Sequence, residues 1–162
     1  MTVNRYLPHV LILPEDDANR QVANGFHLQV ALPKQRHMQV LAVAGGWSEV
    51  IDLFESDHIP QMNTYLNRFM ILLIDFDGQG QARLDAAKAR IPEDLTDRVF
   101  VLGASSEPED LKLSNLGSYE DIGLAMANDC RHETETIWRH NLLRHNAPEL
   151  ERLRRLVRPI LF

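Results

Sequence analysis

Four short runs of apolar residues organise the first two thirds of the chain, with helix-like stretches between them. Each run is too short for a typical helix and lacks the alternation of a half-buried strand, which indicates a strand buried on both faces. The order β-α-β-α-β-α-β predicts a parallel sheet with right-handed crossovers and helices on both faces. The four runs lie at residues 9–13, 38–44, 69–74 and 98–102.

Cap and turn signals give the expected helices. Asp16 or Asp17 is the expected N-cap of a helix from Ala18 to about Asn24, where Gly25 indicates its end. Residues 28–37 are expected to form an extra strand or a loop, and Pro33 argues against a central position in the sheet. Further helices are predicted at residues 47–54, after Pro60, and at 82–90, 118–128, 133–143 and 148–157.

These elements predict an α/β fold with three layers, in which a parallel sheet of about four strands is flanked by helices. At 162 residues, without a linker or an internal repeat, the chain is expected to form one domain. The α/β core covers residues 9–103, and residues 118–162 form a helical C-terminal extension. Leu150, Leu153 and Val157 make an apolar stripe that predicts packing of the extension on the core.

Acidic residues or glycines directly follow the first three apolar runs. The carboxyl ends of parallel strands meet at one edge of a sheet, where open α/β sheets bind ligands. Two carboxylates two residues apart on a strand point to the same side, so Asp75 and Asp77 can share a hard cation such as Mg²⁺. The three clusters are Glu15-Asp16-Asp17, Gly45-Gly46 and Asp75-Phe76-Asp77-Gly78.

Carboxylates this close together need a cation or raised pKa values, and bound Mg²⁺ (or Mn²⁺) gives a scaffold for phosphoryl transfer. In this interpretation Asp75 and Asp77 hold the metal, with Asp16 as a further ligand. Glu15 is a metal ligand or general base, and Gly45-Gly46 lets a phosphate backbone approach closely. The competing interpretation is that the two aspartates only end a strand and start a turn.

The order of these motifs resembles the Toprim domain of topoisomerases, bacterial primases, recombination-repair proteins and OLD-family nucleases. Residues 9–103 carry the resemblance. HVLILPEDDA stands where the family has a strand and its glutamate, LAVAGGWSEVIDLF stands in the strand–glycine–helix segment, and ILLIDFDG stands in the DxD segment. The resemblance implies that Glu15 is the general acid/base and that Asp75 and Asp77 bind Mg²⁺.

The Toprim resemblance implies phosphodiester chemistry on nucleic acid. A nuclease is favoured over a primase or topoisomerase, because the chain has no obvious catalytic tyrosine domain or polymerase-sized partner region. Nuclease members often add an acidic residue after the next strand, and the candidates for it here are Glu107, Glu109 and Asp110.

The sequence is also similar to a response-regulator receiver domain. That resemblance implies that Glu15 and Asp16 bind Mg²⁺, that Asp75 is phosphorylated, and that Ser105 contacts the phosphoryl group. The double glycine after Ala44 and the second carboxylate of Asp77 favour Toprim. A third interpretation is a non-catalytic adaptor with a degenerate acidic site.

The charge is unevenly distributed along the chain. Residues 131–162 hold seven arginines and four glutamates, a balance of +3; because the whole chain carries −6, the remainder carries −9. We therefore expect Arg154, Arg155 and Arg158 to face the acidic edge and contact the phosphate backbone of nucleic acid. The alternative is an ordinary solvated helix.

The composition excludes some classes of protein. A hydrophobic fraction of 44% and a charged fraction of 25% are ordinary for a soluble protein. No apolar run approaches the ~20 residues that span a membrane, so we expect no membrane contact and a cytoplasmic location. The single cysteine, Cys130, excludes an internal disulfide. Nucleic acid is the expected partner, and a protein partner or a homo-oligomer stays open.

Overall fold

The computed structural model describes residues 2–162 and contains one four-stranded sheet in the order β2-β1-β3-β4. All neighbouring strands are parallel, with Ile12 of β1 opposite Ile71 of β3. The predicted α/β fold with a parallel sheet is confirmed. The strands are β1 (His9–Pro14), β2 (Met38–Val40), β3 (Arg68–Leu73) and β4 (Val99–Leu102).

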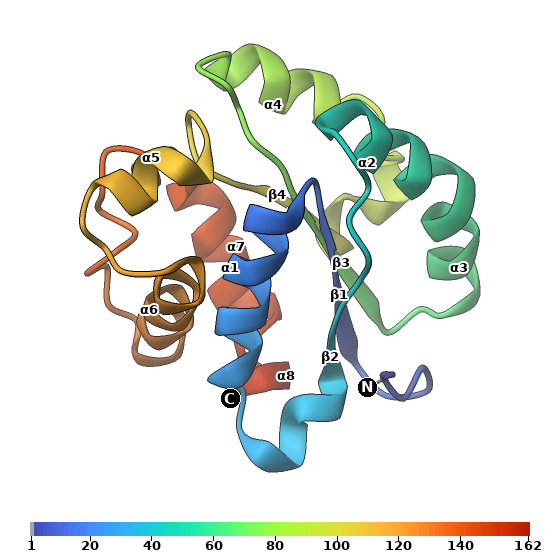
Figure 1. Ribbon diagram of the computed structural model, residues 1–162. Helices are drawn as coiled ribbons and strands as arrows, with labels where there is room; N and C mark the ends of the chain where they lie inside the picture. Colours follow the sequence, from blue (N-terminus) through green and yellow to red (C-terminus); the bar gives the residue numbers. More distant parts are fainter. Residues whose placement is uncertain (1) are drawn as a thin grey trace.

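Helices cover both faces of the sheet, which gives the three layers expected (Figure 1). On one side lie α1 (Asp17–Leu28), α5 (Pro108–Leu113), α6 (Tyr119–His132), α7 (Ala147–Leu156) and α8 (Arg158–Leu161). On the other side lie α2 (Trp47–Leu53), α3 (Ile59–Thr64) and α4 (Gly80–Lys88), with a π-helix, η2 (Phe54–His58), between α2 and α3. Short 3-10 helices are η1 (Leu32–His37), η3 (Glu93–Arg98) and η4 (Arg144–Asn146).

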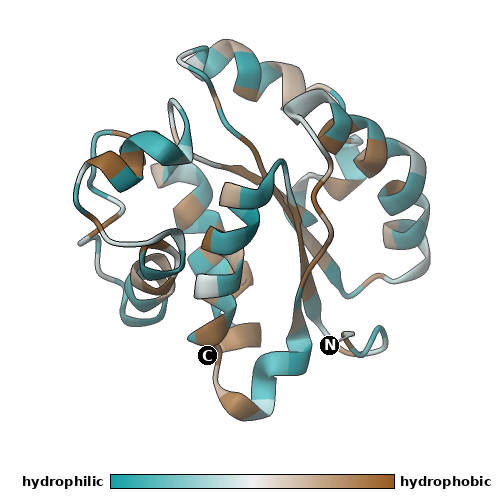
Figure 2. Ribbon diagram, viewed as in Figure 1, coloured by the Kyte–Doolittle hydropathy of each residue, from teal (hydrophilic) through white to brown (hydrophobic). Residues whose placement is uncertain are grey.

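The strands are continuously apolar because alternate residues serve two cores. Ile12 and Leu73 belong to the core under α1, α6 and α7. Leu13 and Leu72 belong to the core under α2, α3 and α4. Figure 2 shows the strands as hydrophobic and most outward helix surfaces as hydrophilic. Burial on both faces is the reason that periodicity two is absent from the sequence.

The C-terminal extension packs on the sheet as predicted. Leu150, Leu153 and Val157 are at most 2% exposed and belong to the first core. Asn146, at the start of α7, exchanges hydrogen bonds with Gly103 after β4, whereas Arg152 reaches the carbonyl of Thr96 before β4. Helix α7 therefore runs antiparallel to β4, and its last turn lies toward the amino ends of the strands.

Two local predictions near the N-terminus are wrong. Helix α1 does not end at Asn24 but continues to Leu28, because Gly25 serves packing rather than termination. A Cβ on Gly25 would lie 2.1 Å from the backbone oxygen of Glu120, so only glycine allows α1 and α6 to approach this closely. Residues 28–37 contain η1 in place of a strand.

Other segments also differ from the predictions. β2 is shorter than the apolar run 38–44, although the N–H groups of Leu41 and Ala44 still bond to β1 carbonyls. The predicted helix 133–143 does not form, because Asp129 accepts hydrogen bonds from the N–H groups of Ile137 and Trp138 and holds the segment as a loop. Helix α5 was not predicted.

None of the helices in residues 2–162 combines the length and the apolar character that crossing a membrane requires.

Candidate acidic site at the strand ends

The acidic clusters meet at the carboxyl ends of the two central strands. From β1 the chain passes to β2 on one side, and from β2 it crosses to β3 on the other side. This is a topological switch point, where open parallel sheets form a crevice for ligands. Glu15 follows β1 directly, and Asp75 lies two residues after β3. The sequence prediction that they share one edge is confirmed.

Glu15 is hydrogen-bonded to β3 and the residues after it through both its backbone and its side chain. Its backbone N–H donates to the carbonyl of Leu73 at 2.9 Å, which extends the parallel ladder by one residue. Its carboxylate oxygen Oε2 accepts the backbone N–H of Asp75 at 2.6 Å. Burial raises the pKa of Glu15 and outweighs the lowering by the hydrogen bond from Asp75, while Asp16 and Asp77 add smaller increases. Glu15 is therefore fixed in place and more basic than a free glutamate.

Asn19 joins the two aspartates nearest to Glu15. Its side-chain amide donates to Oδ1 of Asp16 at 3.1 Å and to Oδ1 of Asp75 at 3.0 Å. Asp16 is the N-cap of α1 and also accepts the backbone N–H of Asn19 at 2.9 Å. Asn19 is only 2% exposed and was not among the predicted site residues. Its position in the first turn after a capping aspartate was the available sequence signal.

Asp75 carries the strongest electrostatic perturbation in the site. Its side chain is buried, and burial is the largest cause that raises its pKa from 3.8 to about 7. The hydrogen bond from Asn19 opposes this, whereas Glu15, Asp16 and Asp77 raise the pKa further. No cation is among these causes, so the negative charge at Asp75 is poorly compensated.

Asp77 does not lie where strand alternation predicted. β3 ends at Leu73, and Asp77 adopts a left-handed conformation with φ of 46° in the following turn. Its half-exposed side chain makes an ion pair with Arg83 of α4 at 2.7 Å. The same Arg83 nitrogen, Nη1, donates to the backbone carbonyl of Asp75 at 2.8 Å. Asp77 therefore pairs with the guanidinium group of Arg83 and does not lie on the same strand face as Asp75.

The two glycines after β2 have different surroundings. The N–H of Gly45 donates to the carbonyl of Glu15 at 2.9 Å, and its φ of 106° turns the missing side chain toward open space. A Cβ on Gly46 would lie 2.4 Å from the Glu49 carboxylate. Gly45 thus reaches the acidic site, although its N–H is already used, and Gly46 lies beside another acid.

The loop after β4 lies beside the loop that carries Asp75 and Asp77. The N–H groups of Phe76, Asp77 and Gly78 donate to carbonyls of residues 104–106. Glu107, the start of the predicted later acidic region, has a raised pKa, first through Glu109 and more weakly through Asp77 and Asp16. This later acidic region therefore adds to the negative potential around the site.

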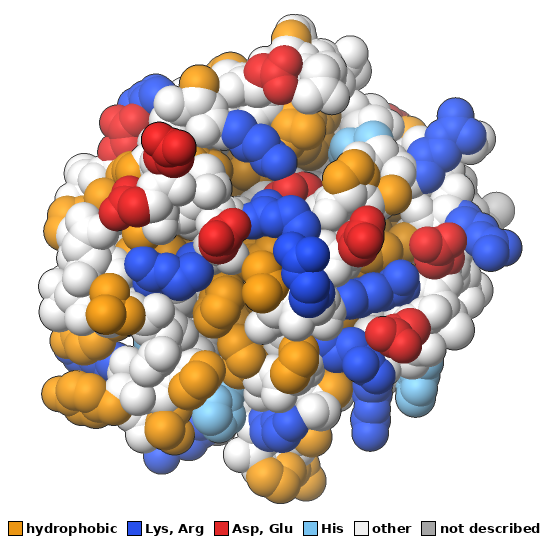
Figure 3. Space-filling model, turned by 180° about the vertical axis from the view of Figure 1, so that it is seen from behind, with side chains coloured by type: hydrophobic (Ala, Val, Ile, Leu, Met, Phe, Trp, Pro, Cys, Tyr) orange, Lys and Arg blue, Asp and Glu red, His pale blue; other side chains and the backbone are white. Residues whose placement is uncertain are grey.

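The predicted arginines of the C-terminal helix do not reach this site. Arg154 donates to the carbonyls of Asp129 and Thr134, and Arg158 donates to the carbonyl of Arg131 at 3.0 Å. Arg155 is exposed on the same end of α7. The expectation that they face the acidic edge is wrong, because α7 carries them toward the other end of the sheet. Figure 3 shows acidic and basic side chains interspersed on the rear face.

The donor set suits a hydrated cation better than a closed metal cage. Within residues 2–162, no three or more His, Cys, Asp or Glu side chains are grouped so that they could hold a metal ion. Mg²⁺, however, usually keeps several waters and takes only one or two carboxylates. Asp16 and Asp75, whose oxygens contact the same Asn19 amide, fit that smaller requirement.

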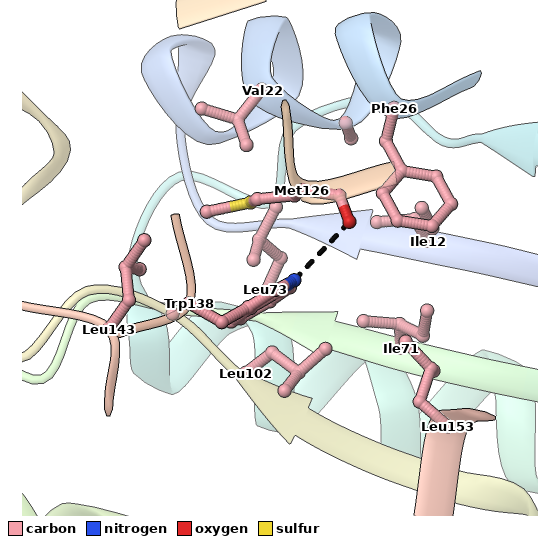
Figure 4. Close-up of a pocket in the computed structure, with 12 residues that line it drawn as sticks. Ile12, Val22, Phe26, Ile71, Leu73, Leu102, Met126, Trp138, Leu143 and Leu153 are labelled. Carbon is pink, nitrogen blue, oxygen red and sulfur yellow. Dashed lines mark hydrogen bonds between the residues drawn. The ribbon is translucent and has the colours of Figure 1, made fainter. Parts of the chain in front are cut away.

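A separate cavity lies in the core between the sheet and α1, α6 and α7 (Figure 4). Its volume is about 40 Å³, and it is lined by apolar side chains and Gly103. The indole N–H of Trp138 does not face an empty space but donates to the carbonyl of Met126 at 3.2 Å. A void of this size and character is a dry packing defect rather than a binding site.

The fold and the site together define a three-layer, Rossmann-like α/β protein with a carboxylate cluster at the switch point of its sheet. No family model, no curated protein and no solved structure matches this chain.

Proposed function

We propose that the carboxylate cluster binds hydrated Mg²⁺ or Mn²⁺ and that the protein hydrolyses phosphodiester bonds in nucleic acid, as a Toprim-like nuclease. The observation that carries this proposal is the linked set of carboxylates. Glu15 bonds to the backbone of Asp75, and Asn19 bridges Asp75 to Asp16. Asp75 is buried, Glu15 and Asp16 are partly buried, and their charge is poorly compensated, which favours a cation of high charge density.

The contacts of each carboxylate indicate the role that it would have. Asp75 and Asp16 would hold the ion, because their oxygens converge on one amide and neither is paired with a basic side chain in the described part of the chain. When bound, Mg²⁺ would neutralise charge on the phosphate and acidify a coordinated water. Glu15 uses only Oε2 within the protein, which leaves Oε1 to accept the proton of the attacking water.

Cleavage of a fluorescently labelled oligonucleotide, DNA or RNA, tests this function. We expect cleavage with Mg²⁺ or Mn²⁺ and none with EDTA. Glu15→Gln should lower the cleavage rate at least ~100-fold, as loss of a general base does. Asp75→Asn should abolish cleavage, because it removes a proposed ligand and its charge.

Asp97→Asn is the matched control, because Asp97 is exposed in η3 at the other end of the sheet. It should cleave as the wild type does. Equal activity of Asp75→Asn and Asp97→Asn would contradict the assignment of the site.

A nucleic-acid substrate is also consistent with the cytoplasmic location expected from the sequence.

A receiver-like function is the second candidate, and two observations favour it. The loop after β3 is hydrogen-bonded to the loop that holds Ser105, as a phosphoacceptor and its serine partner require. The strand order is also that of the first four strands of the flavodoxin-like order 2-1-3-4-5. Incubation with acetyl phosphate and Mg²⁺, followed by mass spectrometry, should then show one phosphoryl group, absent in Asp75→Asn. Absence of Mg²⁺ binding at millimolar concentration would instead favour a non-catalytic adaptor.

A further inference from the structure

One basic side chain, Arg83, belongs to the acidic site and was not predicted. It projects from α4, and its Nη1 donates to the carbonyl of Asp75 at 2.8 Å and to Oδ2 of Asp77 at 2.7 Å. The side chain is only 11% exposed. These contacts place a guanidinium group directly against the loop that carries Asp75.

An aromatic ring also contacts the guanidinium group of Arg83. The carbon Cζ of Arg83 lies 4.7 Å from the centre of the Trp47 ring, within the range of a cation–π contact. Trp47 begins α2, immediately after Gly45-Gly46. Trp47 of α2 and the loop after β3 therefore hold the Arg83 side chain from two directions, so its orientation is determined before any ligand binds.

Most of the donor groups of Arg83 are nevertheless unused. Among the residues that the structure describes, only Nη1 has hydrogen-bond acceptors, and neither Nε nor Nη2 donates to a protein group. A guanidinium presents its remaining N–H groups as a planar fork that matches two oxygens of a phosphate. A solvated surface arginine would not be oriented by contacts with two other segments of the chain.

We propose that Arg83 is the phosphate-binding residue of the acidic site and that its Nε and Nη2 groups bind the non-bridging oxygens of a phosphodiester. This inference rests on the proposed function, because it places the substrate phosphate beside Asp75. It also changes the role of Asp77. Asp77 positions Arg83 through their ion pair rather than serving as the second metal ligand that the DxD spacing suggested.

The binding mode explains how a phosphate is held beside carboxylates. Arg83 offers one positive charge at the site, whereas Arg154 of α7 and Arg158 at the start of α8 lie toward the other end of the sheet. Retention of the Nη1 bonds keeps the guanidinium plane fixed while the remaining N–H groups contact the ligand. A lysine has no such fork, so charge alone should restore only part of the binding.

The test compares Arg83→Gln, Arg83→Lys and the exposed control Arg155→Gln. The probe is a fluorescein-labelled single-stranded oligonucleotide, with Ca²⁺ in place of Mg²⁺ to limit cleavage, and fluorescence anisotropy is measured over a series of NaCl concentrations. Arg83→Gln should weaken binding at least ~10-fold and reduce the salt slope by about one. Arg83→Lys should lie between Arg83→Gln and the wild type, and Arg155→Gln should bind like the wild type.

A second measurement keeps the inference testable if Arg83→Gln does not fold. In the wild type, the ¹⁵N–¹H signal of Arg83 Nε, assigned by its loss in Arg83→Lys, should shift when the oligonucleotide is added. An unshifted signal, or equal affinity and salt slope for Arg83→Gln and Arg155→Gln, would overturn the inference.

The metal is tested separately, by the increase in melting temperature that Mg²⁺ produces. Mg²⁺ should still stabilise Arg83→Gln, because the proposed ligands remain. If Mg²⁺ does not stabilise the wild type but oligonucleotide binding depends on Arg83, the phosphate site stands and the metal-dependent function falls. If Mg²⁺ stabilises the wild type but binding ignores Arg83, the phosphate site falls and the metal site stands.

Discussion

Two buried carboxylates, Glu149 of α7 and Asp75 after β3, have opposite electrostatic surroundings. Glu149 of α7 is 4% exposed, and its carboxylate accepts hydrogen bonds from Lys88 Nζ at 2.8 Å, Arg152 Nη1 at 2.8 Å and the backbone N–H of Val101 at 3.0 Å. Burial alone would raise the pKa of Glu149, but these donors outweigh it and lower the pKa. At Asp75, burial prevails and the pKa rises to about 7.

The difference indicates which carboxylate the fold needs. Glu149 links α7 to β4 and α4 and is compensated by two cations, as expected of a structural group. Asp75 has neighbouring carboxylates and one neutral amide donor, so its charge opposes folding. Groups that perturb stability without local compensation are concentrated at functional sites. The comparison therefore predicts opposite effects when each charge is removed.

The largest expected effect is at Glu149. Glu149→Ala removes the shared acceptor of Lys88 and Arg152 and leaves the N–H of Val101 unpaired, so the free energy of unfolding should fall by about 2–4 kcal/mol. Urea denaturation at pH 7 measures it. Glu151→Gln, an exposed change on the same helix, should shift stability by less than ~0.5 kcal/mol. A loss below ~1 kcal/mol in Glu149→Ala would contradict the structural role.

Asp75→Asn should have the opposite sign. The folded-state pKa of about 7 exceeds the unfolded value of 3.8, so the folded state binds more protons between these values and the charge progressively destabilises the protein as pH rises. At pH 8, where the penalty is complete, the substitution should raise the free energy of unfolding by about 1–3 kcal/mol.

The gain in Asp75→Asn should shrink to less than ~1 kcal/mol at pH 4, close to the unfolded-state pKa of 3.8, because most of the interval between the two pKa values lies above that pH. Urea denaturation at pH 4 and pH 8 gives both values, provided that the fold is intact at pH 4 by circular dichroism. Destabilisation at pH 8 would show that Asp75 is a structural group like Glu149.

Asn19→Ala tests the surroundings of Asp75 by removing its hydrogen-bond donor. It removes the only side-chain donor to Asp75 in residues 2–162 and one of the bonds to Asp16. We expect a loss of about 1–2 kcal/mol at pH 8, because hydrogen bonds to charged groups contribute about this much. In the Asp75→Asn background the loss should be smaller, and a double-mutant cycle in urea measures the coupling. Additive effects would show that the amide does not serve Asp75.

The smallest effect is expected at Lys88. Its side chain is 42% exposed, and Lys88→Met leaves Glu149 with Arg152 and the N–H of Val101. Stability should fall by no more than ~1 kcal/mol, as measured by urea denaturation. A loss as large as that of Glu149→Ala would show that the compensation depends on one cation rather than on the set.

The sheet and its acidic edge were predictable from the sequence because they depend on local patterns. Unbroken apolar runs gave the four strands, and parallel pairing brought Glu15 and Asp75 to one edge. Ser118, a predicted helix start, caps α6 through a capping box with Asp121. The stripe of Leu150, Leu153 and Val157 correctly placed the C-terminal helix on the core.

The errors arose where tertiary contacts override local signals. Gly25 suggested a helix end, but the close approach of α6 requires it inside α1. The Asp75-x-Asp77 spacing suggested a shared face, but the strand ends first and Arg83 captures Asp77. Arg154, Arg155 and Arg158 could not be placed from the charge balance, because their position depends on the direction in which α7 runs along β4.

Stabilisation by Mg²⁺ at pH 8 tests the central claim, namely that Asp75 is a buried charge that a cation compensates. At constant ionic strength, 10 mM Mg²⁺ should raise the free energy of unfolding of the wild type by about 1.4 kcal/mol if the Kd is ~1 mM. Asp75→Asn should show little or none of this increase, whereas Asp97→Asn should show all of it. An equal increase in wild type and Asp75→Asn, or none in the wild type, would contradict the claim.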